Sequence, residues 1–278
     1  MTADLRIGEL SRRTGVSSEL LRAWERRYGL LRPERSSGGY RLYSADDEQR
    51  VRAMTEALAR GISAGEAAKI ALAEGAVRPD SETLVEALVA FDDVEAHATL
   101  DRLLSSFTLQ SVLRDSVITG LHEIGDRWAR GQITVAQEHF ASNLLRGRML
   151  GLARGWDRGG GARALLACPP GEQHDLALIA FGLSLREHGW RITYLGADTP
   201  IDAIVETATR LGPTLIVMAA VDPAPLRACA REIEDLGARF PLALAGAGVD
   251  EAFVRRTGAT HLRDGPVEAA AVVASLSW

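Results

Sequence analysis

The chain has 278 residues, 46% of them hydrophobic and 25% charged, with a formal net charge of −5 at pH 7. This length is compatible with one to three domains and a sizeable buried core, and no low-complexity tract interrupts it. The charge is uneven, because residues 1–60 hold twelve arginines against nine acidic residues and the rest of the chain carries −8. Residues 1–60, here called the head, are thus basic on an otherwise acidic chain, which predicts a nucleic-acid partner for the head alone.

The cysteine content and the lengths of the apolar runs indicate in which cellular compartment the protein is located. Cys168 and Cys229 lie in apolar segments and offer neither a disulfide framework nor a zinc spacing, which favours a reducing compartment. The opening segment MTADLRIGEL lacks an uninterrupted apolar run, and no stretch approaches the roughly 18 consecutive apolar residues of a membrane span. We therefore expect a soluble, cytoplasmic protein.

The first elements predict a helix-turn-helix. Residues 5–14 and 18–28 have the pattern of two short helices. Gly15 separates them, and Ser17 or Ser18 is placed to cap the second helix. This spacing is typical of the helix-turn-helix motif.

A small β-ribbon and two further helices are predicted next. The segment LLRPERSSGGYRLYS combines proline, paired glycines and alternating apolar residues, which indicates a ribbon. Ser44 is placed to cap a helix over 46–60, and another helix is predicted over 63–74. The polar stretch EGAVRPDSE then predicts a linker.

The remainder predicts a helical bundle followed by an α/β domain. Residues 81–154 contain no proline and show several helical periodicities, which indicates about four helices. WDRGGGA is interpreted as a second linker. Five apolar runs then alternate with helical patterns: ARALLAC, WRITYLG, TLIVMAA, PLALAG and THLRD. Such alternation predicts a doubly wound parallel sheet, flavodoxin-like or Rossmann-like, with its first strand inside the sheet. A single helix is expected over LRACAREIEDLG.

The head resembles the DNA-binding domain of MerR-type regulators. The long matches are the recognition-helix run RAWERRYG and the wing GGYRLYS. Arginine suits such a surface because its planar fork meets phosphate oxygens or a guanine edge bidentately. The resemblance implies that the second helix enters the major groove of double-stranded promoter DNA. It predicts the following DNA-binding residues: Ser17, Arg22, Trp24, Arg26, Arg27, Tyr40 and Arg41.

The loop PPGEQHDLA after the first strand of the sheet allows two interpretations. Glu172 and Asp175 can be acids that favour a helix N-terminus, with His174 a solvated loop residue. Alternatively, His174 is a ligand whose far ring nitrogen is held by Glu172. The place of the loop favours the second interpretation, because open α/β sheets bind ligands at the carboxyl ends of their strands.

The same loop resembles the Asp-X-His-X-X-Gly signature of cobalamin-binding domains. The resemblance implies that His174 is the lower ligand of cobalt and that Glu172 takes the place of the aspartate. Ala177 stands where the signature has glycine. After the fourth strand, Gly246 and Gly248 fit the cofactor-binding glycines of this family. After the third strand, alanines 219 and 220 stand where the family often has a serine.

In the bundle, the segment GDRWARGQITVAQEHFASN carries a second set of residues. Thr134 and Gln137 predict a capping box, which places Glu138 and His139 in the first turns of a helix. The latter two share a polar face with Ser142, Asn143 and Arg146, which taken alone is ordinary amphipathicity. Trp128, ten residues before Glu138, gives a spacing similar to the Trp-X9-Glu-His element of CarH-like MerR regulators, which are light sensors. The resemblance implies that Trp128, Glu138 and His139 contact the adenosyl group of adenosylcobalamin.

The resemblance to CarH-like regulators implies a light-responsive transcriptional repressor, not an enzyme, that binds DNA as a homo-oligomer, dimer or tetramer, in the dark. The predicted domains are a DNA-binding domain over 1–76, a helical cap over 80–156 and a cobalamin-binding domain over 161–278. Two alternatives stay open: a regulator of this type that responds to another trigger, and a corrinoid methyl carrier, which has no need of the basic head. In light-sensing relatives a histidine follows the tryptophan and takes cobalt after photolysis, whereas this chain has Ala129.

Overall fold

The chain forms two compact units, residues 1–80 and 81–278, and each has a core of its own. The computed structural model describes residues 5–35, 39–60, 62–76, 81–276 and 278. Residues 77–80 of the predicted linker EGAVRPDSE therefore lie outside the described residues. Among the residues described, no helix is both long and apolar enough to cross a membrane.

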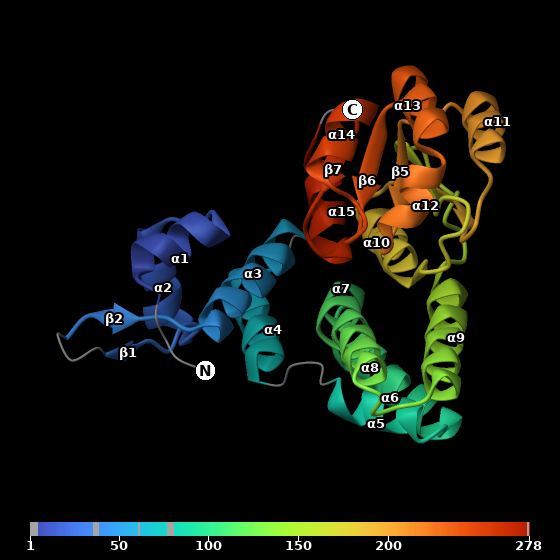
Figure 1. The fold of residues 1–278 in the computed structure, drawn as a ribbon. Coiled ribbons are helices and arrows are strands. Elements are labelled where there is room, and N and C mark those ends of the chain that lie inside the picture. The colour runs from blue at the N-terminus through green and yellow to red at the C-terminus, as the bar shows by residue number, and fades with distance from the viewer. Residues whose placement is uncertain (1–4, 36–38, 61, 77–80, 277) are drawn as a thin grey trace. The chain divides into compact units, whose positions relative to one another are not determined.

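The first unit begins with the predicted helix-turn-helix (Figure 1). Helix α1 spans Ile7–Thr14 and helix α2 spans Ser18–Tyr28. Gly15 ends α1 with φ of 69°, a left-handed conformation that glycine adopts without a steric penalty. Ser17 then starts α2, since its side chain accepts a hydrogen bond from the backbone N–H of Leu20.

The predicted ribbon and its following helices are also present. Strands β1 (Glu34–Arg35) and β2 (Arg41–Leu42) pair in antiparallel fashion and form the wing. Helices α3 (Ala45–Ala59) and α4 (Ala64–Ala76) follow. The predicted cap of α3 is confirmed as a capping box between Ser44 and Asp47.

The second unit opens with the helical bundle. Its segments are α5 (Glu82–Val89), α6 (Asp93–Ser106), α7 (Leu109–Ser111), the π-helical segment η1 (Val112–Ile118), α8 (Thr119–Ala129) and α9 (Val135–Leu152). Because α7, η1 and α8 follow one another without a break, the described part of the bundle consists of four helices, as predicted. The π-helical turns in the third helix are unusual, since π-helix normally occurs as single bulges.

A five-stranded parallel sheet follows the bundle. Its strands are β3 (Arg163–Ala167), β4 (Arg191–Gly196), β5 (Leu215–Ala219), β6 (Leu242–Ala245) and β7 (Thr260–Leu262). The helices that connect and follow them are α10 (Leu176–Glu187), α11 (Ile201–Leu211), α12 (Pro223–Ala228), α13 (Ala230–Arg239), α14 (Glu251–Thr257) and α15 (Pro266–Ser275). The strand order β4-β3-β5-β6-β7 places the first strand inside the sheet, as predicted. The chain therefore has a switch point between β3 and β5, where open α/β sheets bind ligands.

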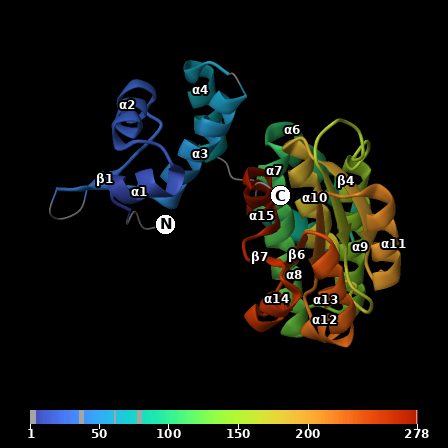
Figure 2. The ribbon, with the colours of Figure 1, turned by 90° about the horizontal axis from the view of Figure 1, so that it is seen from above.

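Two apolar layers cover the two faces of this sheet. Alternate strand residues belong to different layers, as the two-residue period of a strand requires. One layer includes α10 and α15 and continues into the core of the bundle, whereas the other includes α11, α12, α13 and α14. Viewed from above, the green bundle helices lie behind the α/β elements (Figure 2). The bundle therefore stands on the α10 and α15 side of the sheet.

Two details of the prediction are wrong. The segment WDRGGGA is not a free linker, because Trp156 is buried against Gly182 of α10 and belongs to the core. The single helix expected over LRACAREIEDLG is interrupted at Cys229, which separates α12 from α13. In both places a tertiary contact or backbone turn overrides what the local pattern indicates.

Candidate functional site

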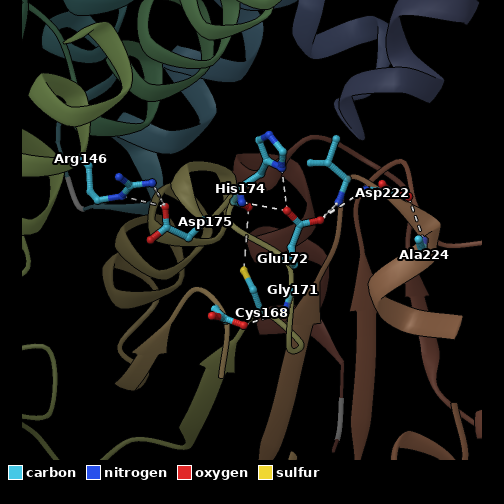
Figure 3. A network of polar contacts seen from close by, with 10 residues as sticks. Arg146, Cys168, Gly171, Glu172, His174, Asp175, Asp222 and Ala224 are labelled. Carbon is cyan, nitrogen blue, oxygen red and sulfur yellow. Dashed lines mark hydrogen bonds and ion pairs between the residues drawn. The ribbon is translucent and has the colours of Figure 1, made fainter. Parts of the chain in front are cut away.

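His174 stands in the loop between β3 and α10, and Glu172 holds it at two points (Figure 3). Glu172 Oε1 lies 2.6 Å from the ring Nδ1 and accepts a hydrogen bond of 2.8 Å from the backbone N–H of His174. The side chain of His174 is 68% exposed. Within the described part of the chain, its Nε2 has no hydrogen-bond partner. The ring is therefore fixed on one side and open on the other.

Glu172 is itself fixed by the neighbouring loop across the switch point. Its side chain is 2% exposed, and Oε2 accepts hydrogen bonds from the backbone N–H groups of Val221 (2.7 Å) and Asp222 (3.2 Å), which follow β5. Burial alone raises the pKa of Glu172, but the hydrogen bonds from His174, Val221 and Asp222 outweigh it and hold the pKa below its ordinary value. Glu172 is therefore an ionised acceptor.

The ionised state of Glu172 decides the tautomer of His174. A carboxylate can only accept, so Nδ1 of His174 must carry the hydrogen. In the neutral form of the ring, Nε2 then carries the free lone pair, and a hydrogen-bonded carboxylate makes that nitrogen a better donor to a metal. This geometry suits a ligand role for His174, and that role stays a prediction.

The surroundings restrict which kind of metal His174 can take. Across the described ranges, no group of three or more His, Cys, Asp or Glu side chains could hold a bare metal ion. His174 would thus be a single donor from the protein, and a metal bound to it would need its other ligands from a cofactor. A cobalt ion inside a corrin ring meets this condition, because it needs from the protein a single axial donor.

Gly246 and Gly248 shape the loop that follows β6. A Cβ atom at Gly246 would stand 2.3 Å from the carbonyl oxygen of Ala220, and one at Gly248 would stand 2.6 Å from the backbone of Asp222. Both glycines thus let this loop approach the loop that carries the partners of Glu172. This packing explains the residue type, and contact of the two glycines with a cofactor stays a prediction.

The sequence departs from the cobalamin-binding family at two places, which differ in their exposure to solvent. Ala177 lies in the first turn of α10 and is exposed to solvent. Ala219 and Ala220 are buried beneath the loops, at the end of β5. The position where the family often has a serine hydroxyl is therefore lined by methyl groups here.

The bundle residues lie around the start of α9. Trp128 stands at the end of α8 and is 50% exposed, which is high for a large aromatic side chain. The capping box of Thr134 and Gln137 is confirmed, and it places Glu138 and His139 in the first turns of α9. Glu138 accepts a hydrogen bond from the Ser142 hydroxyl at 2.6 Å.

These bundle side chains remain apart from the His174 loop. Among the described residues, no hydrogen bond or ion pair joins Trp128, Glu138 or His139 to His174. A direct contact does link the two regions elsewhere, because Arg146 of α9 forms an ion pair with Asp175 (Figure 3). We did not predict this pair from the sequence, where Arg146 is one member of a polar helix face and Asp175 has the pattern of a helix-opening acid.

The DNA-binding residues predicted in the first unit fall into two groups. The exposed ones are Ser17, Arg22, Arg26, Arg27, Tyr40 and Arg41. Arg6 lies over the Tyr40 ring at 4.7 Å, and Arg41 forms an ion pair of 3.1 Å with Glu25 of α2, which ties the wing to the recognition helix. Trp24 corrects the prediction: it is 5% exposed in the core, so it supports α2 from beneath and cannot face DNA.

Comparison with known families matches all three parts of the chain. Residues 5–74 match the MerR HTH family regulatory protein model. Residues 81–150 and 162–273 each match a B12 binding domain model. The chain is therefore a MerR-type helix-turn-helix regulator joined to cobalamin-binding domains.

Two relatives from Myxococcus xanthus define the family further. The HTH-type transcriptional repressor CarA is 34% identical over 258 residues, which cover 89% of this chain and 88% of CarA. The repressor CarH is 32% identical over 234 residues, which cover 78% of each chain. The chain belongs to the family of these two repressors, and this confirms the expectation of a regulator rather than an enzyme.

A solved structure agrees on the fold of a large part of the chain. The monomethylamine corrinoid protein of Methanosarcina barkeri aligns with a TM-score of 0.59 at 19% identity, over 70% of this chain and 96% of that protein. At this identity the likeness concerns the fold alone.

Proposed function

We propose that this protein is a cytoplasmic transcriptional repressor whose oligomer binds DNA in the dark and is controlled by adenosylcobalamin and light. In this proposal residues 1–76 bind promoter DNA, residues 161–278 hold the cofactor and residues 80–156 cap it. The observation that carries the proposal is the orientation of His174 by buried Glu172 at the switch point of the sheet, with Nε2 open.

Each proposed contact uses chemistry that the side chains can supply. His174 would give a nitrogen ligand to the cobalt of the cofactor, and Glu172 would fix its tautomer. Trp128 offers a flat, half-exposed indole that suits the adenine of an adenosyl group. Glu138 offers carboxylate oxygens that suit ribose hydroxyls, and His139 stands exposed beside it. When bound, adenosylcobalamin supplies a cobalt–carbon bond that light can break.

Control by light requires a contact that exists in one state only. The adenosyl group supplies it, because Trp128 and Glu138 lose their partner when that group leaves. We propose that this loss lets the bundle move and changes the oligomer interface. Ala129 offers no donor atom at the position where light-sensing relatives have histidine, so after illumination the corrinoid would be held through His174, with His139 as the other available donor.

The cofactor-binding part is tested by titration in the dark. Purified full-length protein is titrated with adenosylcobalamin and followed by its absorption spectrum, for the wild type, His174→Ala and His188→Ala. His188 is the matched control, because it is another exposed histidine of the same domain, at the far end of α10. We expect His174→Ala to abolish binding or weaken it greatly and His188→Ala to bind like the wild type. Equal affinity and equal spectra for all three would overturn the assignment.

A further inference from the structure

Asp175 is placed to cap α10 but does not do so. It occupies the N-cap position directly after His174, where an aspartate side chain normally accepts a hydrogen bond from its own helix. Here no such bond forms, and the residue is 4% exposed. Oδ1 accepts from Arg146 Nε at 2.9 Å and Nη2 at 2.7 Å, while Oδ2 accepts from the Tyr194 hydroxyl. Both oxygens serve partners outside α10.

Through Arg146, the carboxylate of Asp175 is attached to α9, the helix that carries Glu138 near its start. Residues 138, 142 and 146 recur at a spacing of four, so they share one face of the helix. Glu138 and Ser142 are hydrogen-bonded along that face. Eight residues of α-helix span about 12 Å, at 1.5 Å per residue. The helix therefore sets a fixed separation between Glu138 and the Asp175 contact.

The chain just after α9 makes a second contact, an apolar one, with α10 and Tyr194. Trp156 is buried on α10 at Gly182, where an added Cβ would stand 3.2 Å from the indole. Trp156 also meets the Tyr194 ring edge-on, at 5.8 Å between ring centroids. Tyr194 thus contacts both Asp175 and Trp156, so the polar and apolar attachments act together.

We infer that Arg146, Asp175 and Tyr194 form a positioning joint that sets the separation between the His174 loop and the Glu138 end of the bundle. The inference rests on the proposed function, because this separation is the space in which a corrinoid would lie between His174 and Glu138. None of the three is proposed as a ligand. Their role is to hold the loop and the helix that carry the ligands at matching positions.

A second ion pair between the bundle and the α/β part supplies a matched control. Arg114 of η1 pairs with Glu268 of α15, and both side chains are partly exposed. Within the described ranges, neither residue forms a hydrogen bond with the His174 loop, although the pair joins the same two parts of the second unit. A variant at Arg114 therefore removes one attachment of the bundle and leaves the joint intact.

The test compares Arg146→Gln and Tyr194→Phe with Arg114→Gln in the full-length protein. Amide hydrogen exchange over residues 171–176, the part of the loop after its two prolines, is measured without cofactor, and adenosylcobalamin is then titrated in the dark. We expect Arg146→Gln to speed exchange in this loop and to raise the Kd at least tenfold, with a reduced spectral signature of histidine coordination. Tyr194→Phe, which removes only a hydroxyl group, should change both in the same direction by less. Arg114→Gln should change neither by more than twofold.

Two results would overturn the joint: unchanged loop exchange in Arg146→Gln, or an Arg114→Gln variant that matches it in both readouts. The first shows that the contact does not order the loop, and the second shows that any attachment of the bundle has the same effect. If the wild type takes up no corrinoid, the proposed function fails, whereas the exchange measurement still decides whether the joint orders the loop. Thermal unfolding of each variant identifies one that has lost its fold, and Tyr194→Phe then carries the comparison.

Discussion

Replacing Glu172 by glutamine tests the orientation of His174 without changing the size of the side chain. Each carboxylate oxygen of Glu172 accepts from N–H donors, namely His174 on one side and Val221 and Asp222 on the other. An amide has one oxygen and one NH₂ group, so the glutamine side chain must turn a donor toward donors on one of the two sides. Neither orientation of the amide satisfies the site.

The size of the effect follows from the bonds lost in each orientation. If the NH₂ group faces Val221 and Asp222, two charge-assisted bonds of about 1.5–3 kcal/mol each are lost, and the free energy of unfolding falls by about 3 kcal/mol or more. If it faces His174, Nδ1 must become the acceptor and Nε2 carries the hydrogen, so the ring cannot bind a metal. Loss of such a partner typically weakens metal binding about 10- to 100-fold.

The assay combines thermal unfolding with a dark adenosylcobalamin titration of Glu172→Gln and Glu187→Gln. Glu187 is the control, since it is an exposed acid at the end of α10. We expect the Glu172 variant to show a lower Tm, a Kd raised about 10-fold or more, or both. A Glu172→Gln protein that melts and binds like the Glu187 control would refute the reasoning about the His174 tautomer.

Three further predictions concern other parts of the chain. Arg22→Ala should weaken binding to promoter DNA with little change in Tm and normal corrinoid uptake. Trp24→Ala should instead lower the free energy of unfolding by about 3–5 kcal/mol, and equal Tm values for the two variants would contradict the placement of Trp24 in the core. Burial, with the nearby charges of Asp175 and Glu172, raises the pKa of the Cys168 thiol to about 12, and burial also raises that of Cys229. Both thiols should therefore resist alkylation at pH 8 in the native protein and react after unfolding, and rapid alkylation of the native protein would contradict this. The protonated Cys168 thiol should also stabilise the fold at pH 8, and this contribution to the free energy of unfolding should be lost as the pH rises from 9 toward 12. Ala129→His should retain corrinoid more firmly than the wild type after green light, as measured by gel filtration, and equal losses from both would count against the role of this position.

The parallel sheet, with its first strand inside, could be predicted because its strands are distinct in the sequence. Runs such as TLIVMAA are continuously apolar, as strands buried on both faces must be, and β5 is buried throughout. The alternation with helical patterns then leaves few parallel topologies. The same reasoning placed His174 at a strand end, where its loop meets the loop after β5.

The remaining features depend on contacts between distant residues. Arg146 and Asp175 are separated by 29 positions, and neither has a local signal that names the other as its partner. Trp156 follows a helix and precedes a run of glycines, so its burial depends on the space that Gly182 leaves in α10. Trp24 is a different case, because its spacing of three from buried Leu21 carries the signal of a core position. Trp24 was predicted to bind DNA because it lies in the matching run RAWERRYG, although its helical spacing indicates a buried position.

The most direct test of the account is the size of the full-length protein under three conditions, measured by light scattering. The protein is measured without cofactor, with adenosylcobalamin in the dark, and with adenosylcobalamin after green light. We predict that the dark complex is a larger oligomer than the cofactor-free protein and that illumination returns it to a smaller species. An oligomer of the same size under all three conditions would contradict the claim that adenosylcobalamin and light control its assembly.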